Sequence, residues 1–144
     1  MSRIVPVMKL NEDANRSVNL IRGYAADEII VGGQHLQRPC VVAAQTLITD
    51  WAPAGLEALA LEDLDSIWAL APQVVLLGTG LRQRFASATV RREFQRRNVA
   101  LEAMDLGAAC RTYNVLVQED RAVVAALFTE RLAAGRLPGE SQSQ

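Results

Sequence analysis

Residues 104–121 read MDLGAACRTYNVLVQEDR and lie between two apolar runs, at residues 99–103 and 122–128. This order is typical of a strand, an amphipathic helix and a second strand. Asp105 stands at the turn into the helix, where its carboxylate can accept a hydrogen bond from an unpaired first-turn N–H group. At helical spacing the stretch has one apolar face, formed by Leu106, Ala109, Cys110, Tyr113 and Val117. Its polar flank is formed by Arg111, Asn114 and Gln118. The stretch therefore predicts a buried helix with a polar edge.

The rest of the chain divides into a β-rich half and a half in which helices and strands alternate. Strands are predicted at residues 18–24, 28–31, 34–36, 40–44 and 46–51. The Gly32-Gly33 pair favours the positive φ angles of a tight hairpin. After Pro53 the patterns predict a helix at 61–71, a strand at 74–77, a helix at 87–97 and a strand at 99–104. This order indicates an α/β (α+β) fold with one globular domain at 18–131, an extended arm at 1–17 and a disordered tail at 132–144.

Two motifs resemble those of a family of small α/β proteins. Residues 109–116 read ACRTYNVL, and residues 76–80 read LLGTG at a suitable distance upstream. With Trp51 and the Gly32-Gly33 turn in the expected order, the resemblance covers residues 18–128. The family includes the mitochondrial assembly factor three of respiratory complex I. It implies a three-layer β+β/α sandwich, with a mixed central sheet, helices on one face and a smaller β layer on the other. One departure is Leu106, which stands where the family usually has threonine after Met-Asp.

Composition is that of an ordinary globular protein of 144 residues, 50% hydrophobic and 22% charged. The net charge of −1 gives no global attraction to nucleic acid or membrane. Lys9 is the one lysine among 15 basic residues, which we interpret as bacterial genomic composition. Cys40 and Cys110 have no metal-ligand spacing and indicate buried thiols in a reducing compartment. The N-terminus does not read as a signal peptide, and no apolar stretch approaches the roughly 20 residues of a membrane span, so we expect a cytoplasmic protein that is not membrane-embedded.

The first candidate site is the glycine-containing turn Gly78, Thr79 and Gly80. It follows a buried strand, at the carboxyl end where ligands of open α/β sheets bind. Together with residues 105–108 it is expected to frame a crevice toward which the helix N-terminus points. The turn matches neither nucleotide-binding glycine motif, since Gln83 occupies the third glycine position of one and the other lacks its Lys-Ser or Lys-Thr end. A tight strand exit that requires small residues is the alternative interpretation.

The polar flank of the helix supplies the remaining ligand-binding candidates, so that the full set is Gly78, Thr79, Gly80, Asp105, Arg111 and Asn114. Arg111 can meet a carboxylate or a phosphate bidentately from the crevice wall. It can equally pair with Asp105, Glu119 or Asp120 in a structural ion pair. Both interpretations stay open at this point.

A run of arginines between residues 82 and 97 is the third feature. Its members predicted to form an exposed basic face are Arg84, Arg91, Arg92 and Arg96. Such a face can bind RNA, anionic lipid or an acidic protein partner. The acidic residues between Glu57 and Asp65 offset this positive charge overall, which disfavours nucleic acid. A solvated helix face is the alternative.

No complete catalytic or metal-binding constellation is evident, because the chain has one histidine, His35, and two distant cysteines. We therefore expect no catalytic residue, no metal and no cofactor. The leading hypothesis is a non-catalytic binding or assembly protein with protein partners, which by resemblance assists the biogenesis of respiratory complexes or membrane proteins. The alternative is a protein or enzyme that binds a small anionic metabolite in the crevice of residues 78–80 and 105–111. No heptad or large apolar helix face indicates an oligomeric state.

Overall fold

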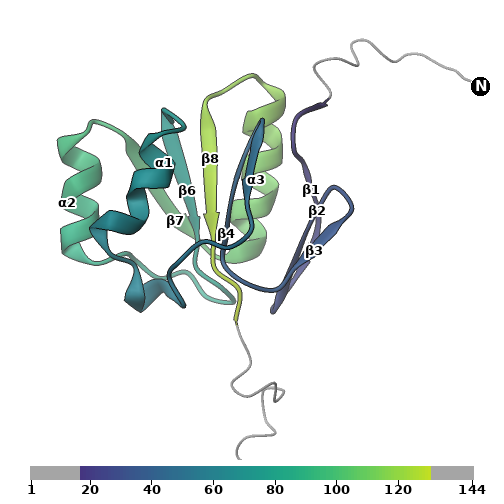
Figure 1. The fold of residues 1–144 in the computed structure, drawn as a ribbon, viewed down its shortest axis with the longest axis horizontal. Coiled ribbons are helices and arrows are strands. Elements are labelled where there is room, and N and C mark those ends of the chain that lie inside the picture. The colour runs from purple at the N-terminus through teal and green to yellow at the C-terminus, as the bar shows by residue number, and fades with distance from the viewer. Residues whose placement is uncertain (1–16, 131–144) are drawn as a thin grey trace, which may run out of the picture.

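The structure is a computed structural model that describes residues 17–130. Two β-sheets and the helices between and around them form its layers (Figure 1). The predicted arm, apart from Ser17, and the predicted tail lie outside the described residues.

The smaller sheet is an antiparallel meander in the order β1-β2-β3. Its strands are β1 (Ile21–Ala25), β2 (Glu28–Val31) and β3 (Gln34–Leu36). In the turn between β2 and β3 only Gly32 has a positive φ angle, 59°, so the expectation of positive φ at both glycines was wrong for Gly33. One glycine is enough to reverse the chain here.

The central sheet has five strands in the order β5-β4-β8-β6-β7. They are β4 (Cys40–Ala43), β5 (Thr46–Ile48), β6 (Val74–Gly78), β7 (Ala100–Met104) and β8 (Val123–Leu127). Strand β6 runs parallel to both β7 and β8, whereas β4 runs antiparallel to β8 and β5, so the sheet is mixed. Strands β6 and β8 lie inside the sheet with both faces covered, which explains their continuous apolar sequences.

The two long helices begin at the residues that their capping side chains predict. Helix α2 (Ala88–Arg96) begins after Ser87, whose hydroxyl accepts a hydrogen bond from the Val90 N–H at 3.2 Å. Helix α3 (Leu106–Gln118) begins after Asp105, whose carboxylate accepts from the Ala108 N–H at 2.8 Å. All five residues of the apolar face predicted for α3 are buried.

The helix predicted at residues 61–71 is much shorter. Residues Leu61–Leu64 form the 3₁₀ helix η3, and α1 covers only Asp65–Trp68; a further 3₁₀ turn, η2, covers Leu56–Ala58. Two hydrogen bonds at Asp63 lie outside the pattern of an α-helix. The Trp51 indole donates to the Asp63 carbonyl at 3.1 Å, and the Asp63 carboxylate accepts from the Ala60 N–H at 2.8 Å. The first bond comes from a distant segment and engages a carbonyl that an α-helical ladder would use, whereas the second caps the N-terminus of η3.

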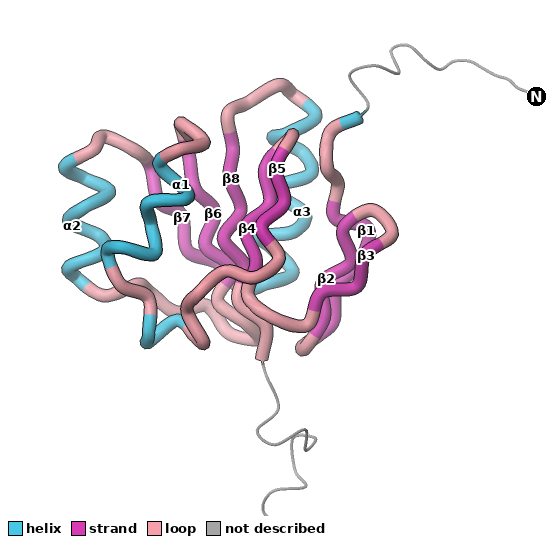
Figure 2. The backbone as a smooth tube through the Cα atoms, in the orientation of Figure 1, coloured by secondary structure: helices cyan, strands magenta, loops and turns pink. Residues whose placement is uncertain are grey.

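The core lies on both faces of the central sheet. Figure 2 shows α1 and α2 on one side of that sheet and α3 with the smaller sheet on the other. On one face, residues of α1 and α2 pack on side chains such as Val75 and Val124. On the other face, α3 packs on β6 and β8 and also contacts β1, so that it shares this face with the smaller sheet.

The predicted fold class, an α/β sandwich with a mixed central sheet and a smaller β layer, is confirmed. Helices nevertheless cover both faces of the central sheet, so the expectation of helices on one face and the smaller β layer on the other was wrong. The crossovers β6-α2-β7 and β7-α3-β8 run in opposite directions across the sheet, and crossovers of the same hand then place α2 and α3 on opposite faces. The position of α3 beside the smaller sheet brings its N-terminus close to β1.

Candidate functional site

The loops that follow β6 and β7 are joined directly to each other. The Thr79 N–H donates to the Met104 carbonyl at 2.9 Å, and the Leu106 N–H donates to the Gly80 carbonyl at 2.8 Å. These bonds close the gap between the two strand ends. The cavity at this edge lies next to the N-terminus of α3 and is lined by residues of both loops, Gly80 and Leu81 after β6 and residues 105–107 after β7, together with residues 24–26 of the smaller sheet.

Gly78 and Thr79 face the interior of the protein. A Cβ atom on Gly78 would lie 2.9 Å from a methyl group of Leu127 and 3.1 Å from the Cβ atom of Ala109. Thr79 is fully buried, and its hydroxyl donates to the Arg82 carbonyl at 2.6 Å and accepts from the Arg84 N–H at 2.9 Å. Both residues shape the strand exit, as the alternative interpretation of this turn expected.

The cavity beside the loops has a volume of about 250 Å³. It is lined by Tyr24, Ala25, Ala26, Gly80, Leu81, Asp105, Leu106, Gly107 and Arg111. Of the six candidate residues it brings together Gly80, Asp105 and Arg111. Gly80 has a φ angle of 92°, and the Glu130 carboxylate occupies the space that a Cβ atom would need, so only glycine suits this position.

Arg111 pairs with none of the three carboxylates that the sequence offered. Its Nη1 instead donates to the hydroxyl of Tyr24, a residue of β1 that the sequence interpretation missed. The ring of Tyr24 lies against the first turn of α3, where a Cβ atom on Gly107 would stand 2.8 Å from the hydroxyl oxygen. Tyr24 remains 43% exposed and Leu81 64% exposed, so aromatic, aliphatic and cationic groups are all accessible around this cavity.

Asn114 lies apart from the cavity and joins α3 to β1. Its Oδ1 accepts from the Ile21 N–H at 2.9 Å, and its Nδ2 donates to the Ile21 carbonyl at 2.8 Å. The side chain thus bonds the backbone of β1 as a neighbouring strand would. In the preceding residue of α3, the buried Tyr113 hydroxyl donates to the Asn19 carbonyl at 2.8 Å. A ligand-binding role for the six candidate residues stays a prediction.

The two cysteine thiols are buried between α3 and the central sheet. Burial raises the pKa of both Cys40 and Cys110 to about 12. Because the thiolate is the reactive form, the native protein should react very slowly with iodoacetamide at about pH 8, and unfolding in urea should accelerate the reaction by orders of magnitude. Mass spectrometry of each cysteine peptide against time measures this. Labelling of the native protein as fast as of the unfolded protein would contradict the burial of these thiols.

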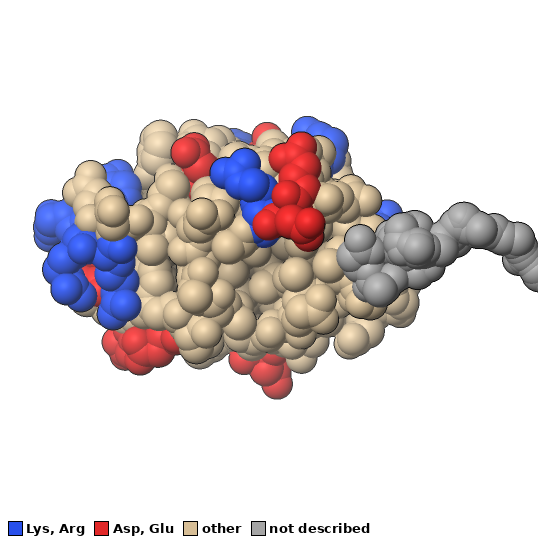
Figure 3. Space-filling view, turned by 90° about the horizontal axis from the view of Figure 1, so that it is seen from above, with Lys and Arg blue, Asp and Glu red and all other residues tan. Residues whose placement is uncertain are grey.

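The predicted basic face is divided between two places. Arg84 lies in the loop before α2 and pairs with Glu57 at 2.7 Å, so its assignment to one face with the α2 arginines was wrong. Arg91, Arg92 and Arg96 are exposed on α2, and Arg96 pairs with Glu93. Figure 3 shows basic side chains, all of them arginines, gathered at the end of the molecule that α2 forms.

Residues 21–128 match the family model described as "Protein of unknown function (DUF498/DUF598)". The chain belongs to this family. The match takes in both sheets, α3 and the cavity beside it. Among residues 17–130, no helix has the length and apolar character needed to cross a membrane.

Two curated relatives of this chain are named as assembly factors. The chain is 30% identical over 110 residues to NADH dehydrogenase (ubiquinone) 1 alpha subcomplex assembly factor 3 of Bos taurus, and 32% identical over 111 residues to that of Danio rerio. These matches cover 75% and 76% of this chain, but the chain spans only 59% and 63% of those proteins. An NMR structure from Xanthomonas campestris is 34% identical with a TM-score of 0.75, over 92% of this chain and 98% of that protein.

Proposed function

We propose that this protein is a non-catalytic assembly factor that binds a subunit of a respiratory complex before that subunit joins the complex. The observation that carries the proposal is the relationship to proteins named as assembly factors of NADH dehydrogenase, which extends over three quarters of this chain. We further propose a bacterial origin and a cytoplasmic location, where newly made subunits are within reach.

The surface around the 250 Å³ cavity is the contact that we propose for the subunit. Tyrosine and arginine are the residue types that most often dominate the energy of protein interfaces, and here Tyr24 and Arg111 are already bonded to each other. The pairing holds both side chains in place before binding, which reduces the entropy lost on association. Leu81 adds an exposed apolar group on the rim.

A protein partner fits this surface better than a small anion does. Sites for small ligands bury most of the ligand and converge several polar groups on it. Among the candidate polar side chains, Thr79 and Asn114 bond backbone groups within the fold, and the Asp105 carboxylate caps α3. Arg111 is thus the polar group that remains accessible, at the edge of an exposed apolar surface.

The test is to delete the gene in the source organism and to measure assembled NADH dehydrogenase on native gels. We expect the deletion to lower the amount of the assembled complex and the wild-type gene to restore it. Arg111→Ala should weaken subunit binding about tenfold or more and restore the complex poorly. The matched control is Arg121→Ala, an exposed arginine after the other end of α3, which should restore it fully. A normal amount of assembled complex in the deletion strain would refute the proposal.

A further inference from the structure

The exposed side of α2 carries a concentration of positive charge that the proposed contact around the cavity does not use. We define the α2 basic surface as Arg91, Arg92, Arg96 and Arg97. Figure 3 shows it as a cluster of basic side chains around a small acidic spot, at the end of the molecule where Figure 1 places α2. With Glu93 among them, the four arginines give this surface a formal charge of +3. Since the whole chain carries −1, the rest of the chain carries −4.

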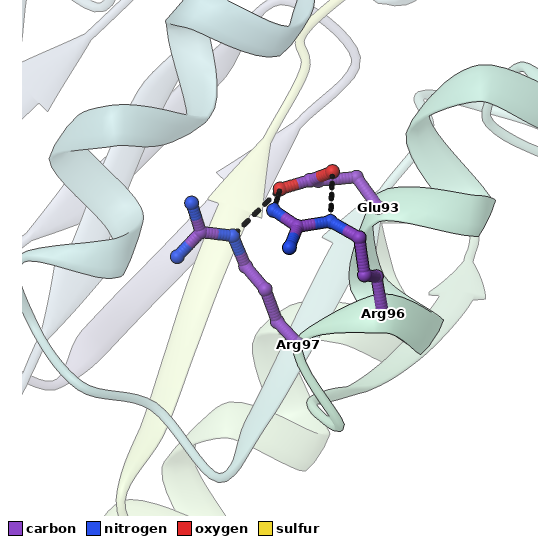
Figure 4. Close-up of polar contacts among 3 residues, drawn as sticks. All are labelled: Glu93, Arg96 and Arg97. Atoms are coloured by element: carbon purple, nitrogen blue, oxygen red, sulfur yellow. Dashed lines mark hydrogen bonds and ion pairs between the residues drawn. The ribbon is translucent and has the colours of Figure 1, made fainter.

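Glu93 holds two of these guanidinium groups in place. Its carboxylate accepts from Arg96 Nε at 3.1 Å and Nη2 at 2.7 Å, and from Arg97 Nε at 2.7 Å (Figure 4). The hydrogen bonds from Arg96 and Arg97 lower the pKa of Glu93 to about 2, so the carboxylate stays ionised at physiological pH. In Figure 4 both terminal nitrogens of Arg97 point away from Glu93, so their N–H groups remain available to another acceptor.

An aromatic ring and a hollow complete the surface. The guanidinium of Arg97 lies over the Trp68 ring, 4.4 Å from its centroid, which fixes the arginine from a second side. Beside them lies an open hollow of about 430 Å³. It is lined by Trp68, Ala71, Pro72, Arg96, Arg97 and Val99. The lining of the hollow thus combines four apolar residues with two cationic side chains that Glu93 holds in place.

We propose that the α2 basic surface docks a segment of a protein partner in which acidic side chains flank an apolar side chain. The acidic groups pair with the arginines, and the apolar group enters the hollow between Trp68 and Val99. This inference rests on the proposed function, because it names the chemistry of a partner for a protein that acts by binding. The separation of charge within the chain also orients an acidic partner toward α2 as it approaches.

Charge and side-chain composition favour a protein over the other anionic partners. A single-stranded nucleic acid is held by exposed aromatic faces on which its bases stack, whereas in the α2 basic surface Arg97 already covers one face of Trp68. An anionic membrane surface needs exposed apolar residues along the helix. The other exposed residues of α2 are Ala88, Thr89 and Gln95, none of which is large and apolar.

The test uses a short fluorescein-labelled peptide in which glutamates flank one leucine, and fluorescence anisotropy measures its binding to the whole protein. We expect binding that weakens as salt concentration rises. Reversing the charge of two exposed arginines, in the double variant Arg91→Glu with Arg92→Glu, should weaken binding at least about tenfold. The matched control is Arg22→Glu with Arg121→Glu, which makes the same change of net charge at exposed positions elsewhere and should change binding by less than about threefold. Replacing the leucine of the peptide by serine should weaken binding without altering the protein.

Absence of binding to the wild-type protein, or equal binding by the two double variants, would overturn the inference. Tighter arginine-dependent binding to phosphatidylglycerol vesicles or to an RNA oligonucleotide would also overturn it, in favour of a membrane or a nucleic acid. The deletion strain tests the assembly role independently of the binding measurements on α2. Normal assembly of NADH dehydrogenase in that strain refutes the assembly role even where the peptide binds through α2. If the deletion strain assembles the complex poorly but the peptide does not bind through α2, the assembly role stands and the inference about α2 is refuted.

Discussion

Gly78→Val should destabilise the protein by about 3 kcal/mol or more, because it inserts three carbon atoms where α3 meets the central sheet. A Cβ atom at this position would lie 2.9 Å from a Leu127 methyl group, 3.1 Å from the Cβ atom of Ala109 and 3.4 Å from Leu106. The Leu127 side chain has no exposed surface into which it can turn, and the Cβ atom of Ala109 cannot rotate away. Helix α3 must therefore move away from β6. Urea unfolding followed by circular dichroism measures the loss.

Gly33→Ala is the matched control for this prediction. Gly33 lies in the exposed turn between β2 and β3, and a Cβ atom there meets nothing within 4 Å. The free energy of unfolding of Gly33→Ala should stay within about 0.5 kcal/mol of the wild-type value. Gly78→Ala should fall between the two, with a loss of about 1–3 kcal/mol. Wild-type stability of Gly78→Val would show that α3 does not pack against the strand as closely as described.

The sequence predicted the central layers of the fold because their signals are local. The period of the α3 apolar face identifies its buried residues, and Ser87 and Asp105 mark helix starts through bonds made within one turn. The run at 74–77 predicts a strand covered on both faces for the same reason. At residues 61–71 the local pattern predicted one continuous helix, but the Trp51 indole bonds the backbone at Asp63 from another segment. No local pattern contains that contact.

The candidate site was harder to predict, because its geometry depends on residues distant in the chain. Arg111 and Tyr24 are 87 positions apart, and their contact requires that the smaller sheet share a face with α3. Gly107 is the one local signal, since a glycine in the first turn of a helix can mark the close approach of another group. The bonds between residues 79–80 and 104–106 likewise depend on β6 and β7 being neighbours. The glycine-containing turn at residues 78–80 carries no information on which strands are neighbours in the sheet.

Asn114→Leu should destabilise the protein by about 2–5 kcal/mol, because it leaves the backbone N–H and C=O of Ile21 without their partner. Ile21 is buried, so water cannot readily replace the lost bonds. We also expect amide hydrogens of β1 to exchange faster than those of β6, since α3 then holds the smaller sheet less firmly. Gln118→Leu is the control, one turn further along the same flank and exposed; it should change stability by less than about 0.5 kcal/mol.

Asn114→Asp tests the same contact through its dependence on pH. The ionised aspartate can accept from the Ile21 N–H but stands against the Ile21 carbonyl, whereas the protonated acid can accept from the first group and donate to the second. Folding therefore favours the protonated form and raises the pKa of this aspartate above its unfolded value. The stability of the variant should therefore approach that of the wild type at pH values below the unfolded pKa, and it should fall as pH rises through the folded pKa. A constant difference from the wild type between about pH 3 and pH 8 would mean that Asn114 does not bond both backbone groups of Ile21.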